Sequence, residues 1–228
     1  MDNKSANASA WGMPGVLDFF AERRGTSAEV YPSEWFFLKD RLKEGMSVLD
    51  IGCAQGGFAA VIAEHVKDFR YVGADVNPEM IARAKTRFPS HTFVHVREGD
   101  FSALGEAKFD LVIVLGILHL HETWRATLKA AWARAQGTLI FDLREWEGTT
   151  IENKARAYMT MDFGAKDDSH RAQRLPYVLL NAADALRVVR QVCADAARLR
   201  HHGYLHAPSG SAVVPADQVM MNTWCAEK

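Results

Sequence analysis

The stretch from Ser47 to Ala60, SVLDIGCAQGGFAA, constrains the fold more than any other part of the chain. Its apolar start, Val48 to Ile51, is typical of a buried strand, and glycines and a helix-forming segment follow directly. Glycine permits tight turns and lets a ligand approach the main chain, and the N–H groups at a helix N-terminus attract polar ligands. The stretch therefore predicts a strand, a ligand-binding turn and a helix in succession.

The spacing of the glycines distinguishes between the classes of ligand that such a turn can bind. A dinucleotide-binding turn has the pattern G-x-G-x-x-G, but Ala54 occupies the place of the second glycine. A P-loop for phosphate ends in Gly-Lys-Ser/Thr, and this turn contains no lysine. VLDIGCAQGG instead resembles the first motif of class I S-adenosylmethionine (SAM)-dependent methyltransferases, which reads hydrophobic-hydrophobic-D/E-x-G-x-G-x-G. Asp50, Gly52 and Gly56 match that motif, and Ala54 departs from its middle glycine by one methyl group.

A second strand end carries an acid suited to a ribose. Phe69 to Asp75 is predicted to be a short strand, and Asp75 lies 23 residues after Gly52. An acid at this place in a βαβ unit can accept hydrogen bonds from both ribose hydroxyls of an adenosine. We therefore expect Asp75 to bind the ribose and Val76 to pack on the adenine; the alternative for Asp75 is a solvated carboxylate.

A third strand end, after Thr92 to Val96, carries Asp100 and Phe101. Gly-Asp-Phe at this place resembles the methyltransferase motif in which the acid accepts from the adenine amino group and the next main-chain N–H reaches a ring nitrogen. The resemblance implies SAM as the cofactor, and S-adenosylhomocysteine as its product. The cofactor-binding residues expected are Tyr31, Asp50, Gly52, Cys53, Ala54, Gly56, Asp75, Val76, Asp100, Phe101 and Leu115.

The methyl acceptor is expected beyond a fourth strand. The apolar run Phe109 to Leu115 predicts a central strand buried on both faces, and His119 and His121 follow its carboxyl end. A hydroxyl acceptor needs a base, and an imidazole titrates near neutral pH. We expect His119 or His121 to take the proton; the alternative is that one caps the next helix and the other is solvated. No Asn/Asp-Pro-Pro-Tyr/Phe pattern for methylation of amino groups occurs, which favours oxygen as the acceptor atom.

The alternation of strands and helices predicts an α/β fold. The resemblance implies a three-layer sandwich around a seven-stranded, mostly parallel sheet of order 3-2-1-4-5-7-6, in which the last strand is antiparallel. Residues 1–44 are expected to form an N-terminal helical cap segment, with helices at 14–24 and 33–42. Residues 45–228 are expected to form the methyltransferase domain.

Two later regions carry separate expectations. Residues 148–180 do not fit the alternation and are predicted to be an insertion, with a helix at 151–158 and a lid that contains Asp167, Asp168, His170 and Arg171. The helix at 123–135 is predicted to end at Gly137. The cluster His201, His202 and His206 is placed at the outer edge of the sheet, and no structural metal is expected.

Composition narrows the function further. A formal net charge of -1 argues against a general nucleic-acid binder. The chain starts without an apolar signal segment and has no run long enough to span a bilayer, so a cytoplasmic protein with no membrane partner is expected. Three widely spaced cysteines indicate reduced thiols. The expected function is methyl transfer to a small-molecule hydroxyl, of a sugar or another polar metabolite, by a monomer or homodimer; a SAM-binding protein without turnover and an RNA methyltransferase are the alternatives.

Overall fold

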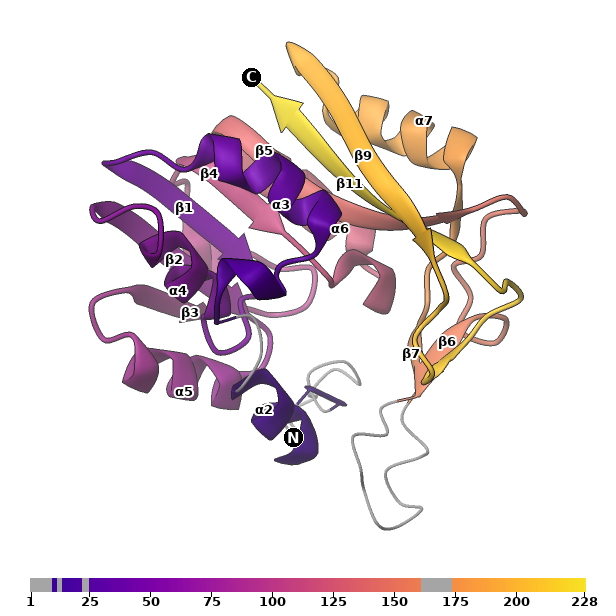
Figure 1. Ribbon diagram of the computed structural model, residues 1–228, viewed down its shortest axis with the longest axis horizontal. Helices are drawn as coiled ribbons and strands as arrows, with labels where there is room; N and C mark the ends of the chain where they lie inside the picture. The colour runs from indigo at the N-terminus through magenta and orange to yellow at the C-terminus, as the bar shows by residue number, and fades with distance from the viewer. Residues whose placement is uncertain (1–9, 12–13, 22–24, 161–173) are drawn as a thin grey trace.

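The computed structural model describes residues 10–11, 14–21, 25–160 and 174–228. Its centre is a mixed sheet in which seven strands follow the order β3-β2-β1-β4-β5-β11-β9 (Figure 1). Strand β11 is antiparallel to both of its neighbours, whereas the strands from β1 to β5 pair in parallel. The predicted fold, strand order and antiparallel last strand are confirmed. The strands are β1 (Met46–Ile51), β2 (Phe69–Asp75), β3 (Thr92–His95), β4 (Phe109–Val114), β5 (Ala135–Trp146), β9 (Arg198–His206) and β11 (Val219–Glu227).

Helices cover both faces of this sheet (Figure 1). Alternate residues of β1 pack into the two layers between the sheet and its helices, because successive side chains of a strand point to opposite faces. Val48 packs in the layer that contains α3 and α4, and Leu49 packs in the layer that contains α6 and α7. The helices are α2 (Pro14–Ala21), α3 (Pro32–Leu38), α4 (Gly57–Ala63), α5 (Pro78–Arg87), α6 (Trp124–Arg134) and α7 (Ala182–Val192).

Local capping signals set where two helices begin. The Asn77 side chain accepts hydrogen bonds from Glu79 N at 2.9 Å and Met80 N at 3.0 Å, and Pro78 occupies the first helical position of α5. Asn181 accepts from Ala183 N at 3.0 Å and starts α7 in the same way. Both helices therefore begin at an asparagine N-cap.

Residues 151–158 form no helix, so that prediction was wrong. Ile151 pairs with Leu179 through two main-chain hydrogen bonds of 2.7 and 2.9 Å, and residues 158–160 form β6 (Tyr158–Thr160). Ile151 and Ala157 are buried in a cluster with Leu179, and this long-range packing outweighs the local helical pattern. Strand β6 joins β7 (Arg174–Pro176) and β10 (Ala212–Val213) in a small sheet, while β8 (Leu180–Asn181) pairs with β5.

Gly137 does not end the preceding helix, contrary to expectation. Helix α6 runs directly into β5, and Gly137 lies inside that strand. A Cβ atom at this position would come within 2.6 Å of the Asp110 carbonyl oxygen. The glycine therefore permits a close approach of two strands, which is a tertiary requirement.

The N-terminal segment contains both expected helices, and the second is shorter than expected. Helix α3 ends at Leu38 and a 3₁₀ turn, Lys39–Arg41, follows it, while α2 ends at Ala21. Residues 22–24 and the expected lid residues Asp167, Asp168, His170 and Arg171 lie outside the described part of the chain. Among the described helices, none combines the length and the apolar character needed to cross a bilayer.

Candidate active site

A cavity of about 650 Å³ lies beyond the carboxyl ends of β1, β2 and β4. Its walls include Gly52 from the turn after β1, Asp75 from the end of β2 and His119 from the segment after β4. Ligands of open α/β sheets bind at this edge. One cavity therefore contains residues from both the predicted donor site and the predicted acceptor site.

The turn after β1 has the backbone geometry that its sequence suggests. Gly52 and Gly56 have φ angles of +83° and +81°, and Ala54 adopts a φ of +46°. Ala54 thus occupies the left-handed region where the motif has its middle glycine, at a cost of roughly 1–2 kcal/mol. A Cβ atom at Gly52 would lie 2.8 Å from the Ile117 side chain, so the turn and the segment after β4 pack against each other here.

Asp75 connects this turn to the end of β2. Its Oδ2 accepts a hydrogen bond from Ala54 N at 3.0 Å, and its Oδ1 accepts from Asn77 N at 2.8 Å. Burial raises the pKa of Asp75, while the N–H donors of Asn77 and Ala54 act in the opposite direction. The carboxylate is therefore held by two main-chain donors at the wall of the cavity.

The expected cofactor-binding residues divide into two groups by position. Asp50, Gly56 and Asp100 are absent from the residues that line the cavity: Asp50 is buried and accepts from Tyr71 Oη at 2.5 Å, and exposed Asp100 accepts from Ser102 N at 2.9 Å. The Asp50 hydrogen bond links β1 to β2, and the Asp100 hydrogen bond lies within the turn that follows β3. Those that line the cavity are Tyr31, Gly52, Cys53, Ala54, Asp75, Val76, Phe101 and Leu115.

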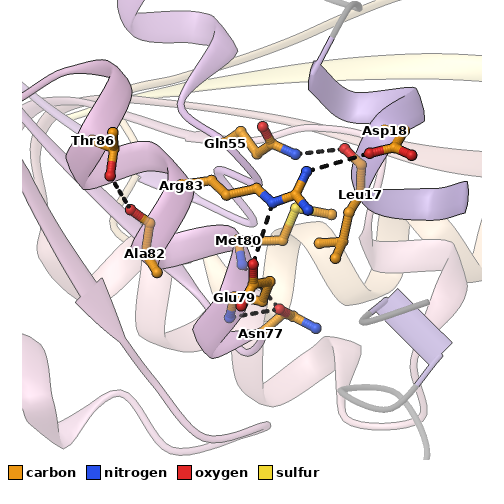
Figure 2. A network of polar contacts seen from close by, with 9 residues as sticks. All are labelled: Leu17, Asp18, Gln55, Asn77, Glu79, Met80, Ala82, Arg83 and Thr86. Carbon is orange, nitrogen blue, oxygen red and sulfur yellow. Dashed lines mark hydrogen bonds and ion pairs between the residues drawn. The ribbon is translucent and has the colours of Figure 1, made fainter. Parts of the chain in front are cut away.

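Helix α2 is attached beside the donor end of the cavity. Figure 2 shows the buried Gln55 side chain donating from Nε2 to the Leu17 carbonyl oxygen at 2.6 Å. Arg83 of α5 contacts Glu79 at 3.3 Å and reaches Asp18 of α2 at 3.4 Å. Trp11, from the segment before α2, lines the cavity. The N-terminal segment thus forms part of the wall of the site.

His119 and His121 both line the cavity and are 7% and 6% exposed. The His119 ring meets the Tyr177 ring edge-on, with centroids 5.1 Å apart, and its carbonyl oxygen accepts from Val178 N at 2.8 Å. His121 Nδ1 lies 3.2 Å from Thr123 Oγ1, while its buried Nε2 has no partner among the described residues. Burial lowers the pKa of His121 to about 4. Both imidazoles are therefore at the cavity wall, and His121 is held neutral.

Comparison with known proteins shows what this chain is similar to. Residues 49–136 match the family described as methyltransferase domain. That segment is similar to a methyltransferase domain, and the chain has a class I methyltransferase-like fold. Among solved structures, it resembles SAM-bound magnesium protoporphyrin IX methyltransferase from Synechocystis PCC 6803, with a TM-score of 0.56, 13% identity, and 100% and 98% of the two chains covered.

Two curated relatives each match about a third of the chain. The ribosomal protein L11 methyltransferase of Thermosipho africanus is 32% identical over 78 residues, which cover 34% of this chain and 30% of that protein. Isonocardicin synthase of Nocardia uniformis subsp. tsuyamanensis is 35% identical over 80 residues, covering 33% and 26%. The chain thus spans less than a third of the length of these relatives.

The end of the cavity beside the turn after β1 fits SAM, the ligand of the solved methyltransferase named above. Gly52, Cys53 and Ala54 of the turn after β1 line the cavity, so a ligand there lies beside this turn. The Asp75 carboxylate lines the same wall and can accept from ribose hydroxyls. Acidic side chains at the cavity, Glu29, Asp75 and Glu98, also suit a cofactor that carries a sulfonium cation.

The other end of the cavity contains residues that sequence reasoning placed elsewhere or missed. His206 is at the carboxyl end of β9, the outer strand of the sheet as expected, and it also lines the cavity, which was not expected. Strand β9 is antiparallel to β11, which is antiparallel to β5, so its carboxyl end lies at the same sheet edge as those of the parallel strands. The expected strand order and direction could therefore have predicted that His206 lies at the cavity. The residues missed altogether include Tyr177, Ser209 and Ser211.

Arg144 belongs to β5 and contributes to the wall of the same cavity. It is buried, lines the cavity and forms an ion pair with Asp142 through Nη1. Asp142 also accepts from Gly116 N at 2.5 Å, so the pair holds the turn that follows β4. Glu145, the next residue of β5, points to the opposite face of the sheet and accepts from Asn222 Nδ2 at 2.7 Å. Within the described chain, no group of three or more His, Cys, Asp and Glu side chains is arranged to hold a metal ion.

Proposed function

We propose that this protein transfers a methyl group from SAM to a hydroxyl oxygen of a small polar molecule, a sugar or another polar metabolite. The observation that carries the proposal is one continuous cavity whose walls include both Asp75 and His119. When bound, SAM supplies a methyl group activated by a sulfonium. The cavity walls exclude water and align the acceptor, which is the main contribution a protein can make to such a displacement.

We assign the base to an imidazole after β4, and prefer His119 to His121. A general base works best when its pKa lies near the working pH, and the pKa of about 4 makes His121 a weak proton acceptor. His119 is oriented by the Tyr177 ring and by the main-chain bond to Val178. In this assignment, the acceptor oxygen gains the methyl group and its proton passes to the His119 ring.

Labelled SAM tests the reaction class. Purified protein is incubated with methyl-labelled SAM and with separate small-molecule, protein and RNA fractions of a cell extract. Label in the small-molecule fraction, in a base-stable ether linkage, is the expected result. Label in protein or RNA would replace the proposal with a macromolecular methyltransferase, and binding of SAM without transfer to any fraction would favour a protein that binds the cofactor without turnover.

Substitution of the two histidines tests the assignment of the base. His119→Ala is expected to lower turnover of the labelled small molecule by roughly 10²–10⁴-fold, the usual contribution of a general base. His121→Ala is expected to lower turnover less, and S-adenosylhomocysteine affinity serves as the folding control for both variants. Unchanged turnover in both variants would eliminate the imidazole mechanism.

A further inference from the structure

Arg144 is a buried cation that has no part so far in the proposed methyl transfer. Burial acts to lower its pKa, but the Asp142 and Glu34 carboxylates contribute to a net rise, so the guanidinium stays charged. A buried ion pair adds little to stability, because the removal of both charges from water offsets their attraction. Arg144 Nε is also buried without a partner among the described residues. The ion pair of Arg144 with Asp142 is therefore better explained by what it holds in place.

On one side, this ion pair holds the start of the segment that carries His119. Asp142 Oδ2 accepts from Arg144 Nη1, and its Oδ1 accepts from Gly116 N at 2.5 Å. Gly116 has a φ of +77°, so the main chain turns sharply where β4 ends. The Asp142 carboxylate thus fixes the turn that leads to His119.

On its other side, Arg144 contacts Tyr177, which lines the same cavity. Burial raises the pKa of Tyr177, whereas the charge of Arg144 and a hydrogen bond from its side chain act in the opposite direction. A guanidinium presents five N–H groups in a fixed plane, so it can bond two acceptors at once. Arg144 therefore connects the Asp142 carboxylate to the Tyr177 hydroxyl.

Tyr177 in turn contacts His119. The two rings meet edge-on, with centroids 5.1 Å apart and an interplanar angle of 71°, which is a preferred geometry for aromatic pairs. The neighbouring Val178 N donates to the His119 carbonyl oxygen at 2.8 Å. The contacts through Arg144 thus form a closed chain that begins and ends on the segment after β4.

We propose that Arg144 is a positioning residue, which holds the Tyr177 ring against His119 and so aligns the imidazole with the methyl acceptor. This inference rests on the proposed function, in which His119 is the base. Arg144 takes no proton, and its effect on the rate passes through the placement of His119. A misplacement of about 1 Å in a reacting group can cost roughly 10²-fold in rate.

The first measurement uses NMR and needs no acceptor. In the full chain, isotope-labelled at histidine Cε1 and saturated with S-adenosylhomocysteine, the resonance that His119→Ala removes belongs to His119. The ring current of Tyr177 shifts this resonance, so its position reports how the two rings lie. Arg144→Lys keeps a cation beside Asp142 but lacks the planar fork that bonds two partners. Arg144→Lys and Tyr177→Phe are each expected to move the His119 resonance.

The second measurement is turnover of methyl-labelled SAM with the small-molecule fraction of a cell extract. Arg144→Lys and Tyr177→Phe are each expected to lower the apparent kcat by about 10-fold or more and to leave KM for SAM unchanged. The double variant is expected to lose no more than the more severe single variant, because both break the same contact. In a His119→Ala background, Arg144→Lys is expected to change kcat by less than about 2-fold.

Arg200→Lys and Tyr158→Phe are the matched controls. Arg200 Nη2 pairs with Glu227 at 2.5 Å, and the guanidinium of Arg174 lies over the Tyr158 ring, 4.2 Å from its centroid. Neither Arg200 nor Tyr158 belongs to the described residues that line the cavity. Both controls are expected to leave the His119 resonance and turnover unchanged.

An unmoved His119 resonance in both Arg144→Lys and Tyr177→Phe would overturn the inference, whether or not an acceptor is methylated. Additive losses of kcat, or an equal loss from Arg144→Lys with and without His119, would also overturn it. Unchanged turnover in His119→Ala, or no binding of S-adenosylhomocysteine by the unmodified protein, would instead remove the proposed function. Unchanged S-adenosylhomocysteine affinity shows that a variant is folded. If Arg144→Lys fails that control, Tyr177→Phe decides, because it removes the same contact from the other side.

Discussion

Asp75 and Ala54 form the smallest unit of the donor site. One carboxylate accepts from Ala54 N and Asn77 N, so it fixes both the turn after β1 and the start of α5. The same carboxylate lines the cavity. A single side chain therefore couples the backbone geometry of the turn to the wall of the cavity.

Replacing Asp75 by asparagine is expected to weaken S-adenosylhomocysteine binding by roughly 10- to 100-fold. The physical reason is that hydrogen bonds to a charged acceptor are worth about 1.5–3 kcal/mol, and the amide offers one accepting oxygen in place of two. Isothermal titration calorimetry measures the effect. Asp68→Asn is the matched control, since exposed Asp68 directly precedes β2 at its opposite end. Equal affinities in the two variants would contradict a ribose role for Asp75.

His121 is expected to make the stability of the protein fall at acidic pH. Its pKa is about 4 when folded against an ordinary 6.5, so between these values the unfolded chain binds a proton that the folded chain does not. Stability from this group is intact above about pH 6.5 and declines as the pH falls, by up to about 3 kcal/mol near pH 4.

Urea unfolding of His121→Gln and the unmodified protein at about pH 7 and about pH 4.5 measures this contribution. The variant is expected to lose less stability between the two conditions. His65→Gln controls for the substitution itself, because the His65 side chain is 40% exposed. The explanation fails if His121→Gln and the unmodified protein lose the same free energy of unfolding.

At the scale of elements, the site depends on contact between the turn after β1 and the segment after β4. Gly52 permits this contact, because Ile117 occupies the space where a side chain at position 52 would stand. Asp142 of β5 holds Gly116 of the same segment through its main-chain N–H. Three strands therefore determine where His119 and the donor turn lie relative to each other.

Gly52→Ala and Gly45→Ala separate backbone strain from steric contact. Both glycines have positive φ angles, +83° and +74°, but a Cβ atom at Gly45 would meet nothing within 4 Å. Each substitution is expected to cost roughly 1–2 kcal/mol for the left-handed backbone. Only Gly52→Ala is also expected to displace Ile117 and weaken S-adenosylhomocysteine binding, which urea unfolding and calorimetry would report separately. A loss of cofactor affinity in Gly45→Ala of similar size would refute this account.

At the scale of the whole molecule, the N-terminal segment is hydrogen-bonded to the central sheet. Thr223 of β11 donates from Oγ1 to Ser33 Oγ of α3 at 2.9 Å, and both residues are completely buried. The two positions lie 190 residues apart in the chain. Helix α3 and the last strand are therefore joined, while the helix α2 that precedes them is attached near the cavity.

Ser33→Ala and Thr223→Val are expected to be strongly non-additive. Each single change removes one partner from a buried pair and is expected to cost about 1–3 kcal/mol, whereas the double change leaves no unsatisfied hydroxyl and costs less than the sum. Urea unfolding of the four proteins in the cycle provides the measurement. Additive losses would indicate that the two hydroxyls are not coupled.

Much of the fold was predictable from local patterns in the chain. The apolar strands, the Asn77 and Asn181 caps and the glycine turn are encoded within short segments, and the resemblance to methyltransferases carried the strand order. Two expectations failed because distant contacts decide them. Residues 151–158 extend because Ile151 pairs with Leu179, and Gly137 enters a strand because Asp110 approaches closely.

The amino-acid sequence alone determined the donor end of the cavity, since Gly52, Ala54 and Asp75 act through the backbone of consecutive elements. The opposite end depended on tertiary structure. His206 reaches the cavity because β9 lies antiparallel to β11, and Tyr177 meets His119 because residues 177–179 pair beside the segment after β4. Such positions depend on the pairing of strands distant in the chain, and a local pattern contains no information about that pairing.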